Sequence, residues 1–169
     1  MLLLNIPPDR RGRICPVDAA RLRELRKVLD ATFRTDLARG ARAVADSAAP
    51  GHGAEALVDG DESTWWAPAG GGDGAGMRVE LDLGGQRAFN VVMLREFIPE
   101  GQHVEKFKVE VPVAGGWREI TAGTTIGYQR LLILKPDVRA RRVRLTVLSS
   151  RGAPRLCRFG LFHAPVLPP

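Results

Sequence analysis

The chain has 169 residues, a mass of 18.4 kDa and a formal net charge of +6, which suits one domain or one domain with an appendage. Its 44% hydrophobic content can supply a core, yet no stretch approaches the ~20 apolar residues of a membrane span. The basic residues are scattered and lack the interleaved aromatics of a nucleic-acid surface. Composition therefore argues against a membrane span and against a nucleic-acid partner.

The first forty residues differ in pattern from the rest. Residues 2–6 form a continuous apolar run, which predicts a strand buried on both faces, as in parallel sheets. Pro16 suits the first turn of a helix, and Gly40 is a candidate for its end. The expected helix carries one apolar stripe, made of Leu22, Leu25, Leu29 and Phe33. A strand and one helix cannot bury their apolar faces alone, so this segment lacks a partner.

From Met77 onwards the chain reads as short strands separated by glycine and proline. Residues 89–94 are apolar on both faces, which predicts a central strand. The other expected strands are residues 77–83, 107–111, 117–120, 131–134, 143–147 and 159–161. About seven or eight strands with no helix between them predict a mainly β fold, an antiparallel sandwich or jelly roll.

Residues 58–66 combine a tight acidic turn with two tryptophans. Because neighbouring side chains of an extended segment point to opposite sides, Trp65 and Trp66 should divide between core and surface. An exposed ring can stack on a sugar, so Trp66 is a candidate ligand-binding residue; packing in the core is the alternative. The carboxylates of Asp59 and Asp61 can accept hydrogen bonds from the backbone amides of their own turn. Asp73 is the other acid that could come near them.

Cys15 and Cys157 lie far apart and match no metal or redox spacing. Two buried thiols are the favoured interpretation, and a disulfide between them is the alternative. The histidines are isolated and show no metal-ligand spacing. These residues suggest no catalytic or metal centre.

The stretch Asp59-Gly60-Asp61-Glu62-Ser63-Thr64-Trp65-Trp66, followed by Val79-Glu80-Leu81-Asp82-Leu83-Gly84, resembles the opening of a coagulation factor V/VIII type C, or discoidin, domain. Residues 2–12 and the following helix resemble the end of the catalytic barrel in α-L-fucosidases of glycoside hydrolase family 29. Arg95-Glu96 with Gly101-Gln102, and residues 123–131, resemble the C-terminal sandwich of the plant and bacterial branch of these enzymes.

The resemblance implies that residues 1–39 are a remnant of the catalytic barrel and that residues 40–169 form a discoidin-like sandwich. It implies a C-terminal accessory region of an enzyme that hydrolyses α-L-fucosides. A complete (β/α)8 barrel needs roughly 250 residues. The two catalytic carboxylates of the family therefore lie upstream of this chain, and none of its residues is expected to be catalytic. A stand-alone glycan-binding, lectin-like module is the alternative.

The resemblance also suggests sites and partners. Arg95, Glu96 and Gln102 surround a hairpin, as a structural ion pair or as a ligand-facing rim, and His103 stands where the family often has arginine. The remaining suggested residues, Asp61 and Thr64, resemble the structural Ca²⁺ position of related modules, although Arg158 stands where a late acidic ligand is usual. No other cofactor is expected.

The expected partners are fucosylated glycans, reached through the parent enzyme, and the catalytic barrel itself. Parent enzymes act in the extracellular or apoplastic space or in lysosomes. The chain as given starts with an apolar run too short for a signal peptide, so its location is left open.

Overall fold

The computed structural model describes residues 5–70, 72 and 74–165. The chain divides into two compact units: the first takes in the residues up to Arg34 together with those from Ala164 onwards, and the second spans Thr35–His163. Most of the predicted strand at residues 2–6 lies outside the described residues, and Asn5 and Ile6 belong to no strand. That the first unit is a barrel remnant stays a prediction.

The predicted helix is α1, Pro16–Phe33, and it begins with proline in its first turn, as expected. It ends before the predicted stop at Gly40. Asp36 already belongs to the second unit, where its carboxylate accepts hydrogen bonds from the backbone N–H groups of Ala38 (3.0 Å) and Leu161 (3.0 Å). Asp36 also pairs with Arg158 at 2.8 Å. This anchor in the sandwich fixes the chain before Gly40.

The apolar stripe of α1 is only partly buried, with Leu22, Leu25 and Phe33 of intermediate exposure. Thr32 is the only buried residue of the helix, and Leu29 is 43% exposed. Isolated helices of this length are marginal in water, and each large apolar side chain gains about 1.5–3 kcal/mol from full burial. The stripe therefore calls for a partner surface. Neither α1 nor any other described helix is long and apolar enough to cross a membrane.

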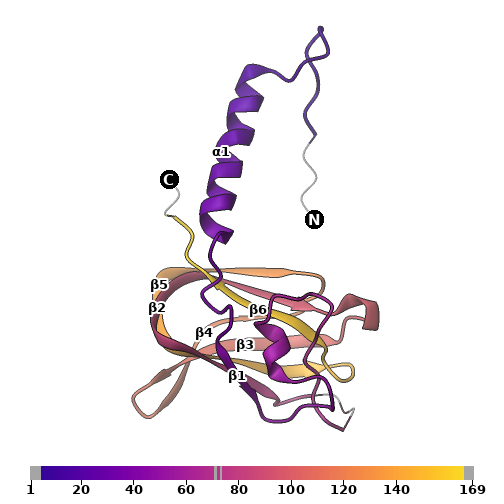
Figure 1. The fold of residues 1–169 in the computed structure, drawn as a ribbon, viewed down its shortest axis with the longest axis vertical. Helices are drawn as coiled ribbons and strands as arrows, with labels where there is room; N and C mark the ends of the chain where they lie inside the picture. Colours follow the sequence, from indigo (N-terminus) through magenta and orange to yellow (C-terminus); the bar gives the residue numbers. More distant parts are fainter. Residues whose placement is uncertain (1–4, 71, 73, 166–169) are drawn as a thin grey trace. The chain divides into compact units, whose positions relative to one another are not determined.

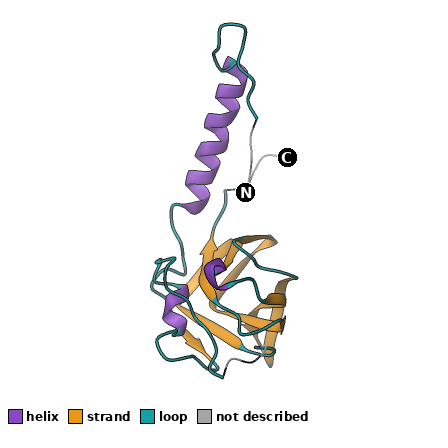
Figure 2. Ribbon diagram, turned by 90° about the vertical axis from the view of Figure 1, so that its right-hand side faces the viewer, coloured by secondary structure: helices purple, strands orange, loops and turns teal. Residues whose placement is uncertain are grey.

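The described residues of the second unit form six strands, and every pairing among them is antiparallel. Figure 1 shows them as a sandwich, and Figure 2 shows the two short 3-10 helices among its loops. The elements are β1 Arg42–Ala45, η1 Ala54–Leu57, β2 Arg78–Glu96, η2 Ile98–Glu100, β3 Val104–Val113, β4 Gly116–Gly123, β5 Arg130–Ser150 and β6 Leu156–Phe162. The predicted mainly β, discoidin-like sandwich is confirmed.

Two long strands pass through both layers of the sandwich. The first part of β2 pairs with β1 and with the end of β5, which in turn pairs with β3; the second part of β2 pairs with the start of β5 and with β6. The predicted strands 77–83 and 89–94 are thus one strand, as are 131–134 and 143–147. The register shifts after Asp82, where Gly84 adopts φ 75°, so the strand bends there without leaving the sheet.

The core lies between the two layers. Alternation buries Val79, Leu81 and Leu83 and turns Glu80 and Asp82 outward, as the sequence predicts. Residues 89–94 are central, because β2 is paired on both sides there. Among the largest fully buried side chains are Trp66, Phe89, Phe107, Phe159 and Phe162.

Candidate functional site

Apart from the β3–β4 turn, the connections between strands gather at one end of the sandwich, on its right-hand side in Figure 1. Backbone hydrogen bonds join them: Glu96 N–H to Gly127 O (2.9 Å), Phe97 N–H to Arg155 O (2.8 Å) and Arg151 N–H to His103 O (2.9 Å). We call this region, with residues 59–66, 97–103, 124–129 and 151–155, the loop end. It contains most of the residues singled out from the sequence.

Trp66 is a core residue. Its side chain is 0% exposed, its indole Nε1 donates to Ser47 O at 3.0 Å, and its backbone pairs with Leu156. A ligand cannot reach a ring that is fully covered, so the geometry does not support Trp66 as a stacking platform. The two tryptophans do divide between core and surface, but Trp65 is the partly exposed one.

Glu96 is buried as well, with 2% exposure. Its Oε1 accepts the backbone N–H groups of His103 (2.7 Å) and Val104 (2.9 Å), and its Oε2 accepts that of Gly127 (2.7 Å). The carboxylate therefore joins the β2–β3 and β4–β5 connections to the end of β2. This geometry favours the structural interpretation of Glu96 over the ligand-facing one.

Arg95 stands at the centre of a polar group that we call the Arg95 cluster: Glu62, Arg95, Tyr128 and Gln129. Arg95 forms an ion pair with Glu62, and its Nε and Nη2 donate to Gln129 Oε1 at 2.9 and 2.6 Å. Its guanidinium also lies 5.1 Å from the centre of the Tyr128 ring, and Tyr128 is 66% exposed. Arg95 thus holds an exposed aromatic ring in place.

The other two candidates flank the same connections. Gln102 is exposed and lies beside Gly127, whereas His103 is partly buried beside Gly101 and Gly152. Nδ1 of His103 is buried and has no hydrogen-bond partner among the described residues. Ligand binding by Gln102 and His103 stays a prediction.

The acidic turn closes on itself. Asp59 Oδ1 accepts Asp61 N–H (2.8 Å), Asp59 Oδ2 accepts the Thr64 hydroxyl (2.7 Å), and Asp61 Oδ1 accepts Ser63 N–H (2.9 Å) and Oγ (2.7 Å). Within the described residues, no group of three or more acidic, histidine or cysteine side chains could hold a metal ion. The turn is thus bonded to itself, the Ca²⁺ site at Asp61 and Thr64 stays a prediction, and Asp73 lies outside the described residues.

The hydroxyl and backbone N–H of Ser63 lower the pKa of Asp61 below its ordinary value of 3.8. A depressed carboxyl pKa contributes stability that is present above the unfolded-state pKa and is lost as pH falls through the folded-state pKa. We expect Ser63→Ala, which removes the hydroxyl donor, to move the Asp61 pKa back toward 3.8. A carboxyl-carbon NMR titration of both proteins measures this, and identical titration curves would contradict it.

A groove of about 390 Å³ opens at the loop end against a stack of rings. Trp65 lies between His52 (ring centres 4.3 Å apart) and Phe97 (4.1 Å). Glu100 and Arg155 stand on the rim and pair at 3.6 Å, and Arg155 Nη1 also donates to Glu100 O at 3.0 Å. The floor is made of the small apolar residues Ala49, Ala67, Pro68 and Ala153. We call this the aromatic groove.

The sequence did not point to the residues of the aromatic groove. Phe97, Glu100 and Arg155 follow or precede strands and match no motif, and they meet Trp65 only because the connections converge. Parity along the chain separates Trp65 from Trp66, but no local signal pairs Trp65 with His52 or Phe97.

A family model described as the F5/8 type C domain matches residues 42–159. The chain belongs to this family. Over nearly its whole length, this chain is also similar to proteins named as α-L-fucosidases. It is 35% identical over 167 residues to a rice protein (Oryza sativa subsp. japonica) that carries an α-L-fucosidase name, covering 96% of this chain and 32% of that protein.

Solved structures agree. The crystal structure of SpGH29 superposes with a TM-score of 0.89 at 34% identity, over 97% of this chain and 36% of that one. A fucose-bound GH29 fucosidase of Ruminococcus gnavus gives a TM-score of 0.84 at 29% identity, over 96% of this chain and 33% of that one. The F5/8 type C chain therefore spans about a third of its fucosidase relatives, and the resemblance to the C-terminal part of α-L-fucosidases is confirmed.

Proposed function

We propose that this chain is an accessory domain of an α-L-fucosidase that binds saccharide in the aromatic groove and leaves hydrolysis to a separate catalytic barrel. The observation that carries the proposal is the groove itself, with its stacked rings, apolar floor and single charged pair on the rim. The fucosidase relatives supply the class of substrate.

The lining of the groove suits a sugar. Small-molecule sites combine a mainly apolar surface with a few polar groups that fix orientation. The alanines and Pro68 can contact the C–H face of a pyranose, while Glu100 can accept and Arg155 can donate hydrogen bonds to its hydroxyls. Since Arg155 is held to Glu100 by two contacts, these polar groups are already oriented.

The carboxylates of the loop end do not resemble a hydrolytic pair. A retaining glycosidase needs two facing carboxyl groups, one of them with a raised pKa. Here Glu62 is paired with Arg95, Glu100 with Arg155, and Glu96 is buried beneath backbone donors. Ser63 lowers rather than raises the pKa of Asp61. We therefore expect the purified chain not to hydrolyse a chromogenic α-L-fucoside, and turnover would contradict this. If turnover persisted in a Glu62→Gln, Asp61→Asn double variant, a different pair of carboxylates would be responsible.

The amphipathic helix α1 supports an accessory role. A free-standing lectin-like module, the alternative function, has no use for an amphipathic helix with only Thr32 buried. In an enzyme three times as long, the helix would pack on the catalytic barrel. Co-purification of this chain with a separately expressed fucosidase barrel tests that contact.

Saccharide binding is tested by calorimetric titration of the full chain with fucosyllactose, lactose and L-fucose. We expect at least one of them to bind, and Arg155→Ala to weaken it about tenfold, because a charge-assisted hydrogen bond is lost. Tyr128→Ala is the matched control, since it removes an exposed aromatic side chain outside the groove.

The two variants separate the possible sites. If Tyr128→Ala abolishes binding while Arg155→Ala does not, the saccharide lies on the Arg95 cluster and the groove proposal is wrong. If none of the three sugars binds, saccharide recognition by this domain is wrong, and the fucosidase relationship stands on the comparisons alone.

A further inference from the structure

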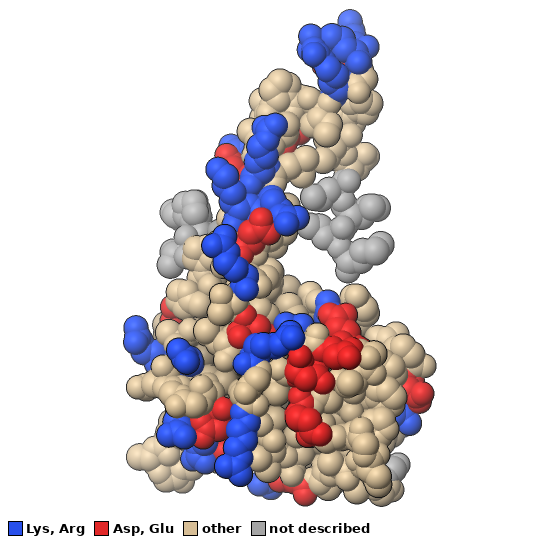
Figure 3. Space-filling view, in the orientation of Figure 1, with Lys and Arg blue, Asp and Glu red and all other residues tan. Residues whose placement is uncertain are grey.

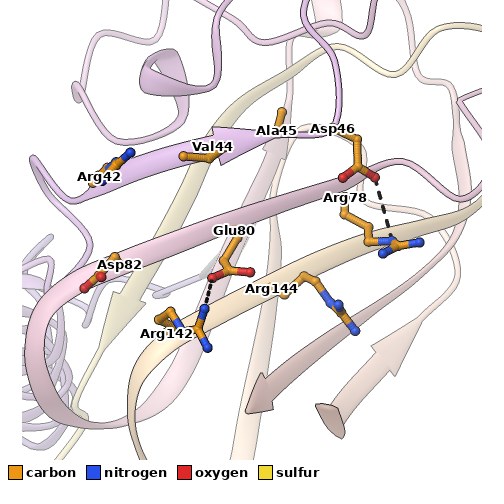
Figure 4. A pocket seen from close by; sticks show the side chains of 9 residues that line it. All are labelled: Arg42, Val44, Ala45, Asp46, Arg78, Glu80, Asp82, Arg142 and Arg144. Carbon is orange, nitrogen blue, oxygen red and sulfur yellow. Dashed lines mark hydrogen bonds and ion pairs between the residues drawn. The ribbon is translucent and has the colours of Figure 1, made fainter. Parts of the chain in front are cut away.

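A second hollow, of about 370 Å³, lies on the outer face of the sheet formed by β1, β2 and β5. We call it the sheet groove. Arg42, Arg78, Arg142 and Arg144 line it, together with Asp46, Glu80 and Asp82. Figure 4 shows these side chains on the same face of the three strands, with ion pairs between Arg78 and Asp46 and between Arg142 and Glu80.

Strand pairing places the charges. Val79, Leu81, Val143 and Leu145 point into the core, so the residues between them project outward in two adjacent rows. Asp82 lies opposite Arg142, and Glu80 lies opposite Arg144. Arg42 of β1 lies opposite Asp82 on the other side of β2. The groove therefore has alternating acidic and basic side chains along its floor.

Some of these charges are committed to protein partners. Arg144 donates to Glu110 and lies 4.1 Å from the centre of the Trp117 ring. Both oxygens of Asp82 accept from Arg141, at 2.9 and 3.0 Å. These groups are held in place and have little capacity left for a ligand.

The two ends of the groove are different. Arg42 is exposed and has no acidic partner in the described part of the chain. Arg78, with 55% side-chain exposure, approaches Asp46 only to 3.7 Å, beyond hydrogen-bond distance. Arg42 lies opposite Asp82, four residues along β2 from Arg78, so the backbone positions of the two arginines are offset by about 13 Å along the strand direction.

We propose that the sheet groove binds an acidic saccharide chain, with sulfate or carboxylate groups at Arg42 and Arg78 and with its hydroxyls on the charged floor between them. Guanidinium groups bind such oxyanions through paired hydrogen bonds. A nucleic acid fits less well, because it carries a charge at every nucleotide and would meet Glu80 and Asp46 along the floor.

Mixed charges over the sandwich agree with this choice. Figure 3 shows acidic and basic side chains interspersed on the visible face of the sandwich rather than a continuous basic surface. A ligand with sparse negative charge and many hydroxyls suits such a surface better than a polyanion of high charge density. This site is separate from the aromatic groove and does not depend on the proposed function.

The test is calorimetric titration of the full chain with a hyaluronan hexasaccharide, which carries one carboxylate per disaccharide, with maltohexaose as the neutral comparison and inorganic sulfate as a competitor. We expect the acidic hexasaccharide to bind and maltohexaose not to bind. Arg42→Ala and Arg78→Ala should each weaken binding of the acidic hexasaccharide about tenfold. Arg87→Ala is the matched control, because Arg87 is an exposed arginine of β2 outside the groove.

Binding that weakens with added NaCl and survives millimolar sulfate is the expected result, since these charges are exposed. Equal weakening by Arg87→Ala would show general attraction to a basic protein and overturn the proposal. Failure of the hexasaccharide to bind, equally tight binding of maltohexaose, or full displacement by inorganic sulfate would also overturn it. Circular dichroism of each variant confirms that the fold is retained.

Discussion

Glu96→Ala is expected to lower the free energy of unfolding by about 4 kcal/mol, a large share of the 5–15 kcal/mol typical of a single domain. The substitution leaves the N–H groups of His103, Val104 and Gly127 without their acceptor. Val104 and its donor are buried, so water cannot replace the carboxylate there without opening the loop end. Urea unfolding followed by tryptophan fluorescence measures the loss.

Two further variants make the Glu96 experiment specific. Glu96→Gln keeps one carbonyl oxygen and so should lose less, because its amide group faces only one of the donors. Glu119→Ala removes an exposed glutamate of β4 and should change stability by less than about 0.5 kcal/mol. A Glu96→Ala protein as stable as the Glu119→Ala protein would show that the carboxylate does not join these connections, and would reopen its role as a ligand-facing residue.

Trp66→Ala is expected to cost about 3–5 kcal/mol, the range for truncating a fully buried aromatic side chain. The ring is 0% exposed, and the substitution also removes the Nε1 donor to Ser47 O. The cavity would form where Trp66 lies between Ser47 and Leu156. Thermal and urea unfolding of the variant measure the loss, with the far-ultraviolet circular dichroism recorded first.

The control for Trp66 is Trp117→Ala. Trp117 is only partly buried, and its ring carries the guanidinium groups of Arg142 and Arg144. This substitution should cost about 1 kcal/mol, mainly through the lost cation–π contacts. Equal stability losses at Trp66 and Trp117 would contradict the assignment of Trp66 to the core. A Trp66→Phe protein, which keeps most of the ring volume, should recover part of the loss.

Both experiments concern residues that the sequence suggested as ligand-binding and that the structure buries. Glu96 and Trp66 support the loop end, whose exposed groups include Tyr128 of the Arg95 cluster and Glu100 of the aromatic groove. The surface available for binding therefore depends on buried contacts a few residues away. Variants at Glu96 or Trp66 that reduce saccharide binding should also reduce stability, whereas Arg155→Ala should reduce binding alone.

Much of the fold could be predicted from the sequence. Alternation identified the outward rows at Glu80 and Asp82, and the continuous apolar run at 89–94 identified the central strand, because both depend on a local period of two. Pro16 and the helical spacing predicted α1, and the acidic turn with its tryptophans indicated the F5/8 type C family. Each of these features depends on the residue types within a short stretch of sequence.

The tertiary structure decided what a given polar or aromatic residue does. Parity separates Trp65 from Trp66 but cannot say which one faces the core, since that depends on Leu156 and Ser47. The acceptor role of Glu96 depends on Gly127, 31 residues away. The aromatic groove likewise joins Trp65 to Phe97 and Arg155. The sequence determined the elements and the family, and contacts between distant residues determined the sites, because burial and hydrogen bonding depend on the assembled sheets.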